Sequence, residues 1–288
     1  MQALSGDIPG QGGTFLVQPR VEGRSVLPLL EGVSHAHNPQ ARISVVIPTL
    51  NEEGSISRAI RSCREAGPSE VVVADGGSRD RTVEIARELA DVVVFAPRGR
   101  AAQMNAGAAA ALGEILLFLH ADTRLPAGSA SAVVDALRDP AVIGGAFRIR
   151  LAASPGAGRY VRGMLRITGR MISARASVTR AYTGDQVIFV RTETFRAVGG
   201  YPGIPLMEDV ELSRRMRRAG NTVLLPFHVA SSGRRFEAWG PLRTVLFMWR
   251  LRIGYLLGKP PSRCAETWRR GPALRRRDSR PPTSSAGE

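Results

Sequence analysis

The sequence contains almost no lysine, few aromatic residues and only two cysteines. Cys63 and Cys264 lie far apart in the chain and form no metal-type spacing, so a reducing compartment is the simplest expectation. The N-terminus shows no basic start followed by an apolar stretch, and no uncharged apolar run reaches about eighteen residues. We therefore expect neither a signal peptide nor a transmembrane helix, and a cytoplasmic protein with peripheral contact to the inner face of the cell membrane left open.

Three familiar motifs are also missing. The chain has no Gly-x-Gly-x-x-Gly after a strand, no Gly-x-x-x-x-Gly-Lys-Ser/Thr and no Gly-x-Ser-x-Gly. These absences remove the main support for a dinucleotide-binding protein, a P-loop enzyme and an α/β-hydrolase.

The residue type present in excess is arginine. The formal net charge is +15, and because Lys259 is the only lysine, 39 of the 40 basic residues are arginine. A guanidinium group binds two phosphate oxygens at once, so a nucleic acid, an anionic membrane or a diphosphate substrate could each account for the excess. We expect no nucleic acid, because Tyr160 is the only aromatic residue interleaved with the arginines from Arg159 to Arg180.

The order of apolar and polar runs predicts one folded domain with appendages. Residues 1–40 are rich in Gly, Pro and Ser without sustained periodicity, and we expect a disordered leader there. Strands expected at 43–47, 71–74, 92–95 and 115–119 then alternate with helices expected at 55–65, from 78 or 80 to 89, and at 101–112. This alternation predicts an α/β fold with a doubly wound, mainly parallel sheet.

The second half of the chain is less regular. The expected elements are a helix at 127–137, a strand at 142–149, a basic amphipathic helix at 159–172, a strand at 185–190, a helix at 210–218 and a largely apolar helix at 241–257. We expect the sheet domain to cover 41–233, an apolar and basic helical segment to cover 234–261, and a disordered tail rich in Arg, Pro and Ser to cover 262–288.

The expected helix at 159–172 has an arginine stripe opposite an apolar stripe. The stripes consist of Arg159, Arg162, Arg166 and Arg170, and of Val161, Met164, Leu165 and Met171. Such a helix packs its apolar stripe on the core of the protein, or lies on a membrane with its arginines toward lipid headgroups. The segment 241–257 is too short and too charged to span a bilayer, but it can lie along the same surface. Both interpretations stay open.

Polar residues follow three of the four expected strands directly. They are the runs Pro48-Thr49-Leu50-Asn51-Glu52, Asp75-Gly76-Gly77-Ser78 and His120-Ala121-Asp122. The carboxyl ends of parallel strands meet at one edge of a sheet, where ligands bind in open α/β folds, so we expect the three runs to line one pocket. Arg98 and Arg100 follow the remaining strand at the same edge. Carboxylates, arginines and a metal position together suit a nucleoside diphosphate.

These runs, together with the stretch 206–215, resemble the motif series of family 2 glycosyltransferases of the GT-A fold, over about residues 43–233. The resemblance implies that an activated sugar binds through its nucleotide. The residues implied for this role are Pro48, Thr49, Glu52, Asp75 and Arg100. It also implies that Glu208 and Asp209 form the acidic pair of the site, with Glu208 at the nucleotide sugar and Asp209 as the catalytic base.

The same resemblance identifies His120-Ala121-Asp122 as the Asp-x-Asp motif, with Asp122 on a divalent Mn²⁺ or Mg²⁺ ion. The first position departs from the motif, so His120 stands where a carboxylate normally contacts the ribose. His228, after an expected strand at 222–225, is a candidate further metal ligand, although a lone histidine is more often structural. The run Gly184-Asp185-Gln186 and the arginine-rich end are similar to a subgroup linked with radical-SAM/selenoprotein clusters and arsenosugar biosynthesis.

We therefore predict an inverting, metal-dependent glycosyltransferase. It would move a sugar to a hydroxyl or carboxyl group of an unknown acceptor, either a lipid-like one such as a carotenoid acid or a small molecule. One alternative is a sugar-phosphate nucleotidyltransferase, which would need a lysine in the loop at 48–54, where there is none. The other is a membrane- or nucleic-acid-binding module on an inactive GT-A fold, which the presence of Asp75, Asp122 and Asp209 disfavours.

Overall fold

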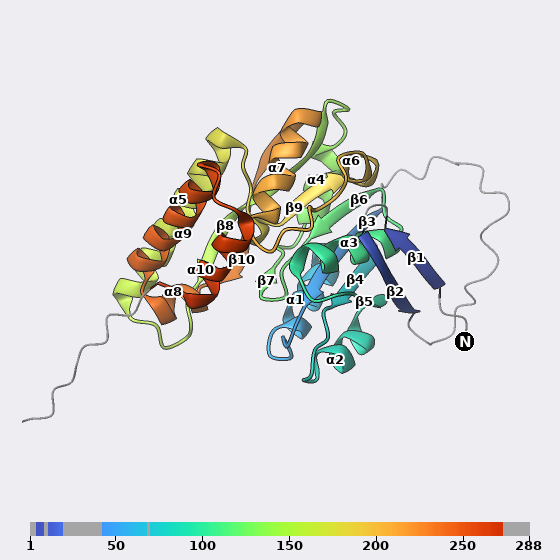
Figure 1. Cartoon of the computed structure of the whole chain (residues 1–288), viewed down its shortest axis with the longest axis horizontal. Coiled ribbons are helices and arrows are strands. Elements are labelled where there is room, and N and C mark those ends of the chain that lie inside the picture. The colour runs from blue at the N-terminus through green and yellow to red at the C-terminus, as the bar shows by residue number, and fades with distance from the viewer. Residues whose placement is uncertain (1–3, 9–10, 20–41, 68–69, 273–288) are drawn as a thin grey trace, which may run out of the picture.

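A mixed sheet of ten strands runs through the molecule, in the order β1-β2-β5-β4-β3-β6-β9-β8-β10-β7 (Figure 1). This computed structural model describes residues 4–8, 11–19, 42–67 and 70–272 of the 288-residue chain. The sheet and the helices around it confirm the predicted α/β class.

Four neighbouring strands of the sheet are parallel and form one half of it. They are β3 (Ile43–Thr49), β4 (Glu70–Asp75), β5 (Val92–Phe95) and β6 (Ile115–Phe118). β3 pairs in parallel with both β4 and β6, and β4 pairs in parallel with β5. Their nearly continuous apolar sequences fit strands covered on both faces. The predicted alternation of strands and helices in this half is confirmed.

Helices cover both faces of this parallel half. The three helices are α1 (Ile56–Ala66), α2 (Thr82–Leu89) and α3 (Arg100–Ala110). The core of one face contains side chains of α1 and α2, and the core of the other face contains side chains of α3. A Cβ atom at Gly107 of α3 would lie only 2.4 Å from Cγ1 of Val46, so the glycine lets α3 pack directly on β3.

The other half of the sheet mixes strand directions. Its strands are β7 (Thr123–Arg124), β8 (Val142–Ala152), β9 (Ile188–Arg191) and β10 (Asn221–Ser232). β9 runs antiparallel between β6 and β8, β8 and β10 are parallel, and β7 pairs with the end of β10. The β7–β10 pairing places the chain that follows Asp122 beside the chain that precedes α8 (Arg234–Trp239), which matters for the site below.

Three short helices and a 3₁₀ turn surround this half of the sheet. They are α4 (Ser129–Ala136), α6 (Thr192–Ala197), α7 (Glu208–Ala219) and η1 (Gly184–Gln186). The strand expected at 185–190 therefore begins later, because its first residues form η1. Asp209 lies within the first turn of α7.

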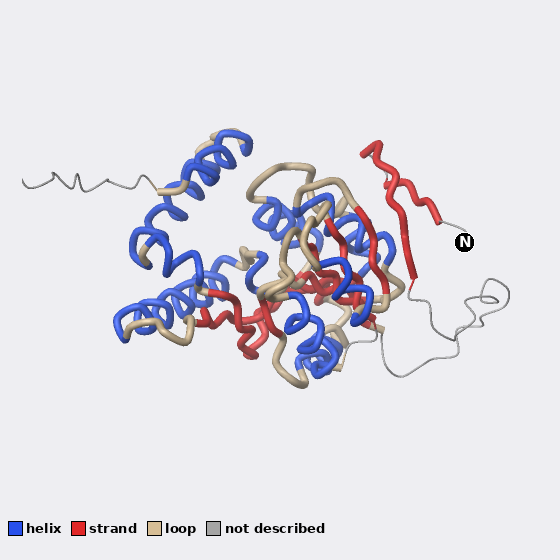
Figure 2. The backbone as a smooth tube through the Cα atoms, turned by 90° about the horizontal axis from the view of Figure 1, so that it is seen from below, coloured by secondary structure: helices blue, strands red, loops and turns tan. Residues whose placement is uncertain are grey.

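The remaining long helices gather at one end of the molecule, far from the N-terminal strands (Figures 1 and 2). They are α5 (Arg159–Thr179), α9 (Pro241–Leu256) and α10 (Pro261–Arg270). α10 corrects the expectation of a disordered tail from 262 onward. It is held because Cys264 and Ala265 are buried and the ring of Trp268 stacks on Phe247 of α9, apolar contacts that the surrounding arginines obscure in the sequence. Residues 273–288 lie outside the described part of the chain.

The N-terminal region differs from expectation in a similar way. Within the expected leader, Leu4–Ile8 and Gln11–Pro19 form the strands β1 and β2. β2 pairs antiparallel with β5 and so extends the sheet at its open edge. A strand at the edge of a sheet has unpaired backbone groups, and β2 pairs with those of β5. The rest of 1–40 lies outside the described residues.

No helix in the described ranges combines the length and apolar character needed to cross a membrane.

Candidate active site

The strand-end residues of β3 and β4 are joined by buried hydrogen bonds. The Thr49 hydroxyl donates to Oδ1 of Asp75 over 3.1 Å, and Oδ2 of Asp75 accepts the backbone N–H groups of Gly77 and Ser78, each over 2.8 Å. Pro48, also buried, pairs with Ala74 in the same two strands. The turn after β4 therefore fixes the carboxylate of Asp75 at the carboxyl edge of the sheet, as predicted.

Gln103 of α3 forms hydrogen bonds with the same two strand ends. Its amide nitrogen donates to the carbonyl oxygens of Thr49 over 2.6 Å and of Ala74 over 3.0 Å. The residue is 3% exposed, so these bonds are protected from water. Sequence reasoning missed Gln103, because a glutamine within an alanine-rich helix gives no signal of this contact.

Glu52 and Asp122 share one arginine. An Nη2 atom of Arg234 lies 2.8 Å from Glu52 and 3.3 Å from Asp122, so the guanidinium joins the loops after β3 and β6. Burial raises the pKa of the Asp122 carboxyl above its ordinary value, although His120 and Arg234 oppose the shift. Arg234 was also missed from the sequence, because only the β7–β10 pairing brings it to this edge.

His120 has a carboxylate partner from another part of the chain. Its Nδ1 atom lies 3.0 Å from Oδ1 of Asp185 in η1. Burial alone would lower the pKa of His120, but the hydrogen bond and charge of Asp185 outweigh burial and raise it. Burial alone would raise the pKa of Asp185, but the hydrogen bond and charge of His120 outweigh burial and lower it. Both shifts favour a protonated imidazole facing an ionised carboxylate.

The two acidic residues at the start of α7, Glu208 and Asp209, have different partners. Glu208 is buried and its Oε1 atom lies 2.8 Å from Nε of Arg100, while its Oε2 atom is buried without a hydrogen-bond partner. Burial raises the pKa of Glu208, and Arg100 opposes the shift. Asp209 accepts the N–H groups of Gly184 over 2.8 Å and of Val210 over 2.7 Å. Asp209 is thus fixed beside η1, next to Asp185.

A cavity of about 200 Å³ adjoins these groups. Its polar lining includes Arg100, His120, Asp185 and Asp209. The rest of its wall is mostly apolar and comes from α5, α9, α10, the start of α7 and the segment before it. These residues are Met171, Ile172, Leu206, Met207, Val210, Val245, Met248, Trp249, Leu251 and Trp268. Met171 and Trp249 are about half exposed, at 52% and 47%, so the cavity reaches the molecular surface beside them.

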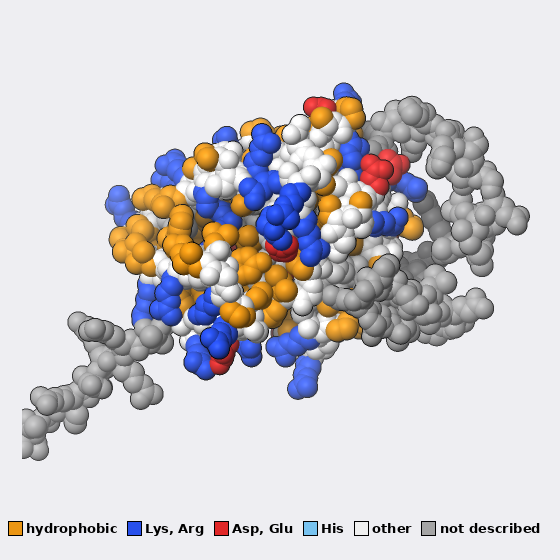
Figure 3. All heavy atoms as spheres, turned by 45° about the horizontal axis from the view of Figure 1, so that its top comes forward, with side chains coloured by type: hydrophobic (Ala, Val, Ile, Leu, Met, Phe, Trp, Pro, Cys, Tyr) orange, Lys and Arg blue, Asp and Glu red, His pale blue; other side chains and the backbone are white. Residues whose placement is uncertain are grey.

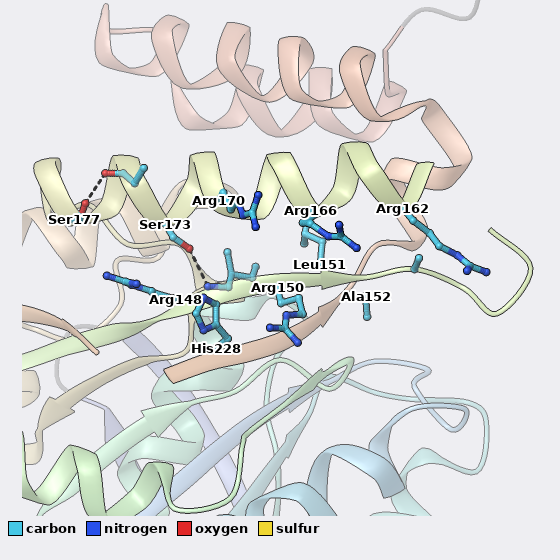
Figure 4. Close-up of a pocket in the computed structure, with 13 residues that line it drawn as sticks. Arg148, Arg150, Leu151, Ala152, Arg162, Arg166, Arg170, Ser173, Ser177 and His228 are labelled. Carbon is cyan, nitrogen blue, oxygen red and sulfur yellow. Dashed lines mark hydrogen bonds between the residues drawn. The ribbon is translucent and has the colours of Figure 1, made fainter. Parts of the chain in front are cut away.

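His228 lies outside the cavity beside Asp209. It lies on β10 in a separate groove between α5 and β8, among arginines of both elements (Figure 4). Those arginines are Arg148, Arg150, Arg162, Arg166 and Arg170. Partial burial and the charges of Arg150 and Arg148 lower the pKa of His228. The structure gives no support to His228 as a metal ligand, because cations surround it and no group of three or more His, Cys, Asp or Glu side chains in the described chain could hold a metal.

The family model described as glycosyl transferase family 2 matches residues 44–197. The chain is 32% identical over 166 residues to an undecaprenyl-phosphate 4-deoxy-4-formamido-L-arabinose transferase of Edwardsiella ictaluri, covering 50% of this chain and 50% of that protein. It is 36% identical over 97 residues to the protein of the same name from Pectobacterium carotovorum, covering 29% of this chain and 30% of that protein. The chain thus matches half or less of the length of these relatives.

Two solved structures share the fold. A mannosyltransferase from Pyrobaculum calidifontis, in complex with GDP-Man and Mn²⁺, has a TM-score of 0.53 at 22% identity, covering 75% of this chain and 61% of that one. A glucosyl-3-phosphoglycerate synthase from Mycobacterium tuberculosis, in complex with Mg²⁺ and uridine diphosphate, has a TM-score of 0.51 at 21% identity, covering 74% of this chain and 80% of that one. At these identities the likeness shows the fold alone, and it agrees with the predicted GT-A class.

Proposed function

The chain belongs to glycosyl transferase family 2, and from this membership we propose that it transfers a sugar from a nucleotide-sugar donor to an acceptor held in the cavity beside Asp209. The observation that carries the proposal is the position of Asp209. It lines the cavity together with His120 and Asp185, and it is fixed by the N–H group of Gly184 next to that pair. A carboxylate that is fixed between a donor edge and an apolar cavity suits transfer between the two.

The carboxyl edge of the parallel strands forms the donor side of the proposal. Asp75 is oriented by Thr49 and two N–H groups, so it can accept from a base or ribose donor. Gly76 and Gly77 follow it and let a ligand approach the backbone closely. Arg100, held by Glu208, supplies positive charge for the diphosphate.

Asp122 is the residue that would hold a divalent ion. Mg²⁺ is typically bound by one or two carboxylates together with substrate phosphates, and a single Asp122 beside Glu52 fits such a shared site. When bound, Mn²⁺ or Mg²⁺ would neutralise negative charge on the departing diphosphate. Arg234 already bridges the two carboxylates, so it holds them in place and adds a further positive group at this edge.

Asp209 is the proposed base. An acceptor hydroxyl needs a carboxylate within hydrogen-bond reach to take its proton as the bond to the sugar forms, whereas a carboxyl acceptor is already ionised at neutral pH. Direct attack by an acceptor on the side opposite the diphosphate inverts the sugar carbon, and we include inversion in the proposal.

The apolar wall of the cavity favours a lipid-like acceptor over a small polar molecule. The relatives named above carry undecaprenyl phosphate, a lipid phosphate, in their names, and a carotenoid acid is another lipid-like acceptor. Hydrophobic side chains also gather on the surface of the helical end, with arginines around them (Figure 3). The exposed large apolar side chains of α5 and α9 include Ile167, Met171, Val178, Leu246, Trp249 and Ile253. We propose that this face rests on a membrane surface that supplies the acceptor.

No observation favours the alternative of a binding module on an inactive fold, because Asp75, Asp122 and Asp209 are each held in place by a hydrogen bond or an ion pair. No observation favours a sugar-phosphate nucleotidyltransferase either. Placement in the subgroup linked with radical-SAM clusters and arsenosugar biosynthesis remains a prediction from the sequence, to which the relatives named above add nothing.

The test is release of nucleoside diphosphate from a panel of UDP- and GDP-sugars, with Mn²⁺ or Mg²⁺ and without either. We expect at least one donor to be hydrolysed slowly without acceptor, and we expect Asp75→Asn to weaken its binding. A folded protein that binds and hydrolyses none of these donors would contradict the proposed function.

A further inference from the structure

Two arginines in the cavity beside Asp209 lack a partner. Arg175 of α5 and Arg252 of α9 both line it, and the guanidinium group of neither makes a hydrogen bond or ion pair with any residue that the structure describes. The Nη1 atom of Arg175 is buried with no hydrogen-bond partner. Most buried polar groups in proteins are hydrogen-bonded, so a buried guanidinium nitrogen without a partner calls for an explanation.

The two helices present these arginines in the same way. Met171 lies four residues before Arg175 on α5, and Met248 lies four residues before Arg252 on α9. Residues four apart occupy one face of a helix, and all four side chains line the cavity. The wall therefore changes from apolar to cationic within one turn on both helices.

Burial disfavours the positive charges of Arg175 and Arg252. Burial and then the charge of Arg252 lower the pKa of Arg175 to about 10. Burial also lowers the pKa of Arg252. The charge of Asp209 opposes the shift in both arginines, but its oxygens already accept N–H groups from Gly184 and Val210. An anion bound by the two guanidinium groups would compensate both charges.

We propose that Arg175 and Arg252 bind the anionic headgroup of the acceptor, and that the acceptor is an amphiphile with a phosphate or carboxylate on an apolar chain. The inference rests on the proposed function, since it concerns the acceptor side of the same site. The headgroup lies at the arginines near Asp209, and the chain follows Met171, Met248 and Trp249 to the surface. A neutral lipid would leave both guanidinium groups unpaired, and a free sugar phosphate would leave the apolar wall uncovered.

Calorimetric binding to the full chain tests this with three probes: farnesyl phosphate below its micelle concentration, farnesol and inorganic phosphate. We expect farnesyl phosphate to bind at least about 10-fold more tightly than either of the others, because only it satisfies both parts of the cavity. We expect Arg175→Gln and Arg252→Gln each to weaken farnesyl phosphate about 10-fold or more and to leave farnesol unchanged.

Arg170→Gln is the matched control. It removes the same charge from the same helix, but Arg170 lines the separate groove between α5 and β8 (Figure 4). It should therefore bind farnesyl phosphate like the wild type. Wild-type binding of farnesol as tight as that of farnesyl phosphate, or an equal loss in all three variants, would overturn the proposal.

Two further measurements distinguish acceptor binding from a structural role of Arg175 and from a failure of the proposed function. Thermal unfolding without ligand should give Arg175→Met a melting temperature equal to or above that of the wild type, because a binding arginine without its ligand is not stabilising. A lower melting temperature together with unchanged farnesyl phosphate binding by Arg175→Gln would show a structural role instead. UDP and GDP binding should be unchanged in every variant. If neither nucleotide binds the wild type while the arginine effects persist, the proposed function fails and the anion site stands.

Discussion

The Nδ1 atom of His120 lies 3.0 Å from Oδ1 of Asp185, a residue 65 positions further along the chain. The resemblance to the family predicts an Asp-x-Asp motif at residues 120–122, where the chain has His120 in the first position, and the carboxylate of Asp185 lies beside that histidine. The same turn, η1, orients Asp209 through the N–H group of Gly184. The His120–Asp185 pair therefore couples the donor edge of the site to the proposed base.

The stability given by this pair should depend on pH. The pKa of His120 is raised above its ordinary 6.5, so its contribution is complete below 6.5 and is lost as pH rises through the higher folded value. The pKa of Asp185 is lowered from 3.8, so its contribution is present above 3.8 and is lost as pH falls through the lower folded value. The pair should stabilise most between these limits.

Asp185→Asn should consequently lower the melting temperature at pH 6 and have a smaller effect at pH 9. A loss of about 1 kcal/mol corresponds to roughly 2–4 °C for a domain of this size. Melting curves of the wild type and the variant at both pH values give the comparison. An equal decrease at pH 6 and pH 9 would mean that the hydrogen bond does not depend on the charge of His120.

The parallel half of the sheet could be predicted from the sequence because local patterns determine it. Buried strands such as β3 read as apolar runs, and each ends in polar residues that mark the binding edge. The partners of those polar residues could not be predicted. Arg234 reaches Asp122 only through the pairing of β7 with β10, and Gln103 reaches the strand ends only because Gly107 lets α3 approach them.

The same reason explains the errors at both ends of the chain. β2 is placed by its backbone pairing with β5, a distant contact that the composition of 1–40 does not indicate. α10 depends on contacts of Cys264 and Trp268 with α9, within a sequence that arginine dominates. Composition indicated disorder in both cases, because it does not register contacts that a distant element supplies.

Asp122→Asn should abolish turnover and remove the metal dependence of nucleotide binding. An amide is a poorer ligand than a carboxylate for Mn²⁺ and Mg²⁺, and Asp122 is the only carboxylate of its motif. UDP and GDP titrations with Mn²⁺, and with a chelator in its place, measure the dependence directly. Asp135→Asn, an exposed acid on α4, is the control. Unimpaired activity of Asp122→Asn in chelator would remove the metal from the proposal.

Asp209→Asn should reduce transfer to an acceptor hydroxyl by roughly 100-fold or more and leave donor affinity near that of the wild type, because the base removes the proton of that hydroxyl. The amide can still accept the N–H group of Gly184, so η1 should keep its position. The measurements are the affinity for the donor, and transfer at saturating donor. A parallel loss of donor affinity would place Asp209 in the nucleotide site.

The final prediction concerns the membrane, for which the structure changes the expected orientation of α5. Leu165 packs into the core, while Met171 is exposed rather than buried. Arg162, Arg166 and Arg170 do not simply point to solvent but line the groove over β8 (Figure 4). Three arginines of one helix therefore join Arg148 and Arg150 in one cationic groove. Its positive charge would attract an anionic membrane surface.

We expect the protein to sediment with anionic vesicles and to be released by raised salt, because each arginine near an anionic surface contributes about 1 kcal/mol and is screened by ions. Replacing Arg159, Arg162, Arg166 and Arg170 with glutamine should weaken binding to anionic vesicles by about 100-fold or more at low salt. Replacing Leu246 and Ile253, both exposed on α9, with serine should weaken binding without changing its salt dependence. Equal binding to neutral and anionic vesicles would exclude the arginines from the contact. Binding to neither would mean that the apolar face serves another purpose, and that the acceptor reaches the cavity without a membrane.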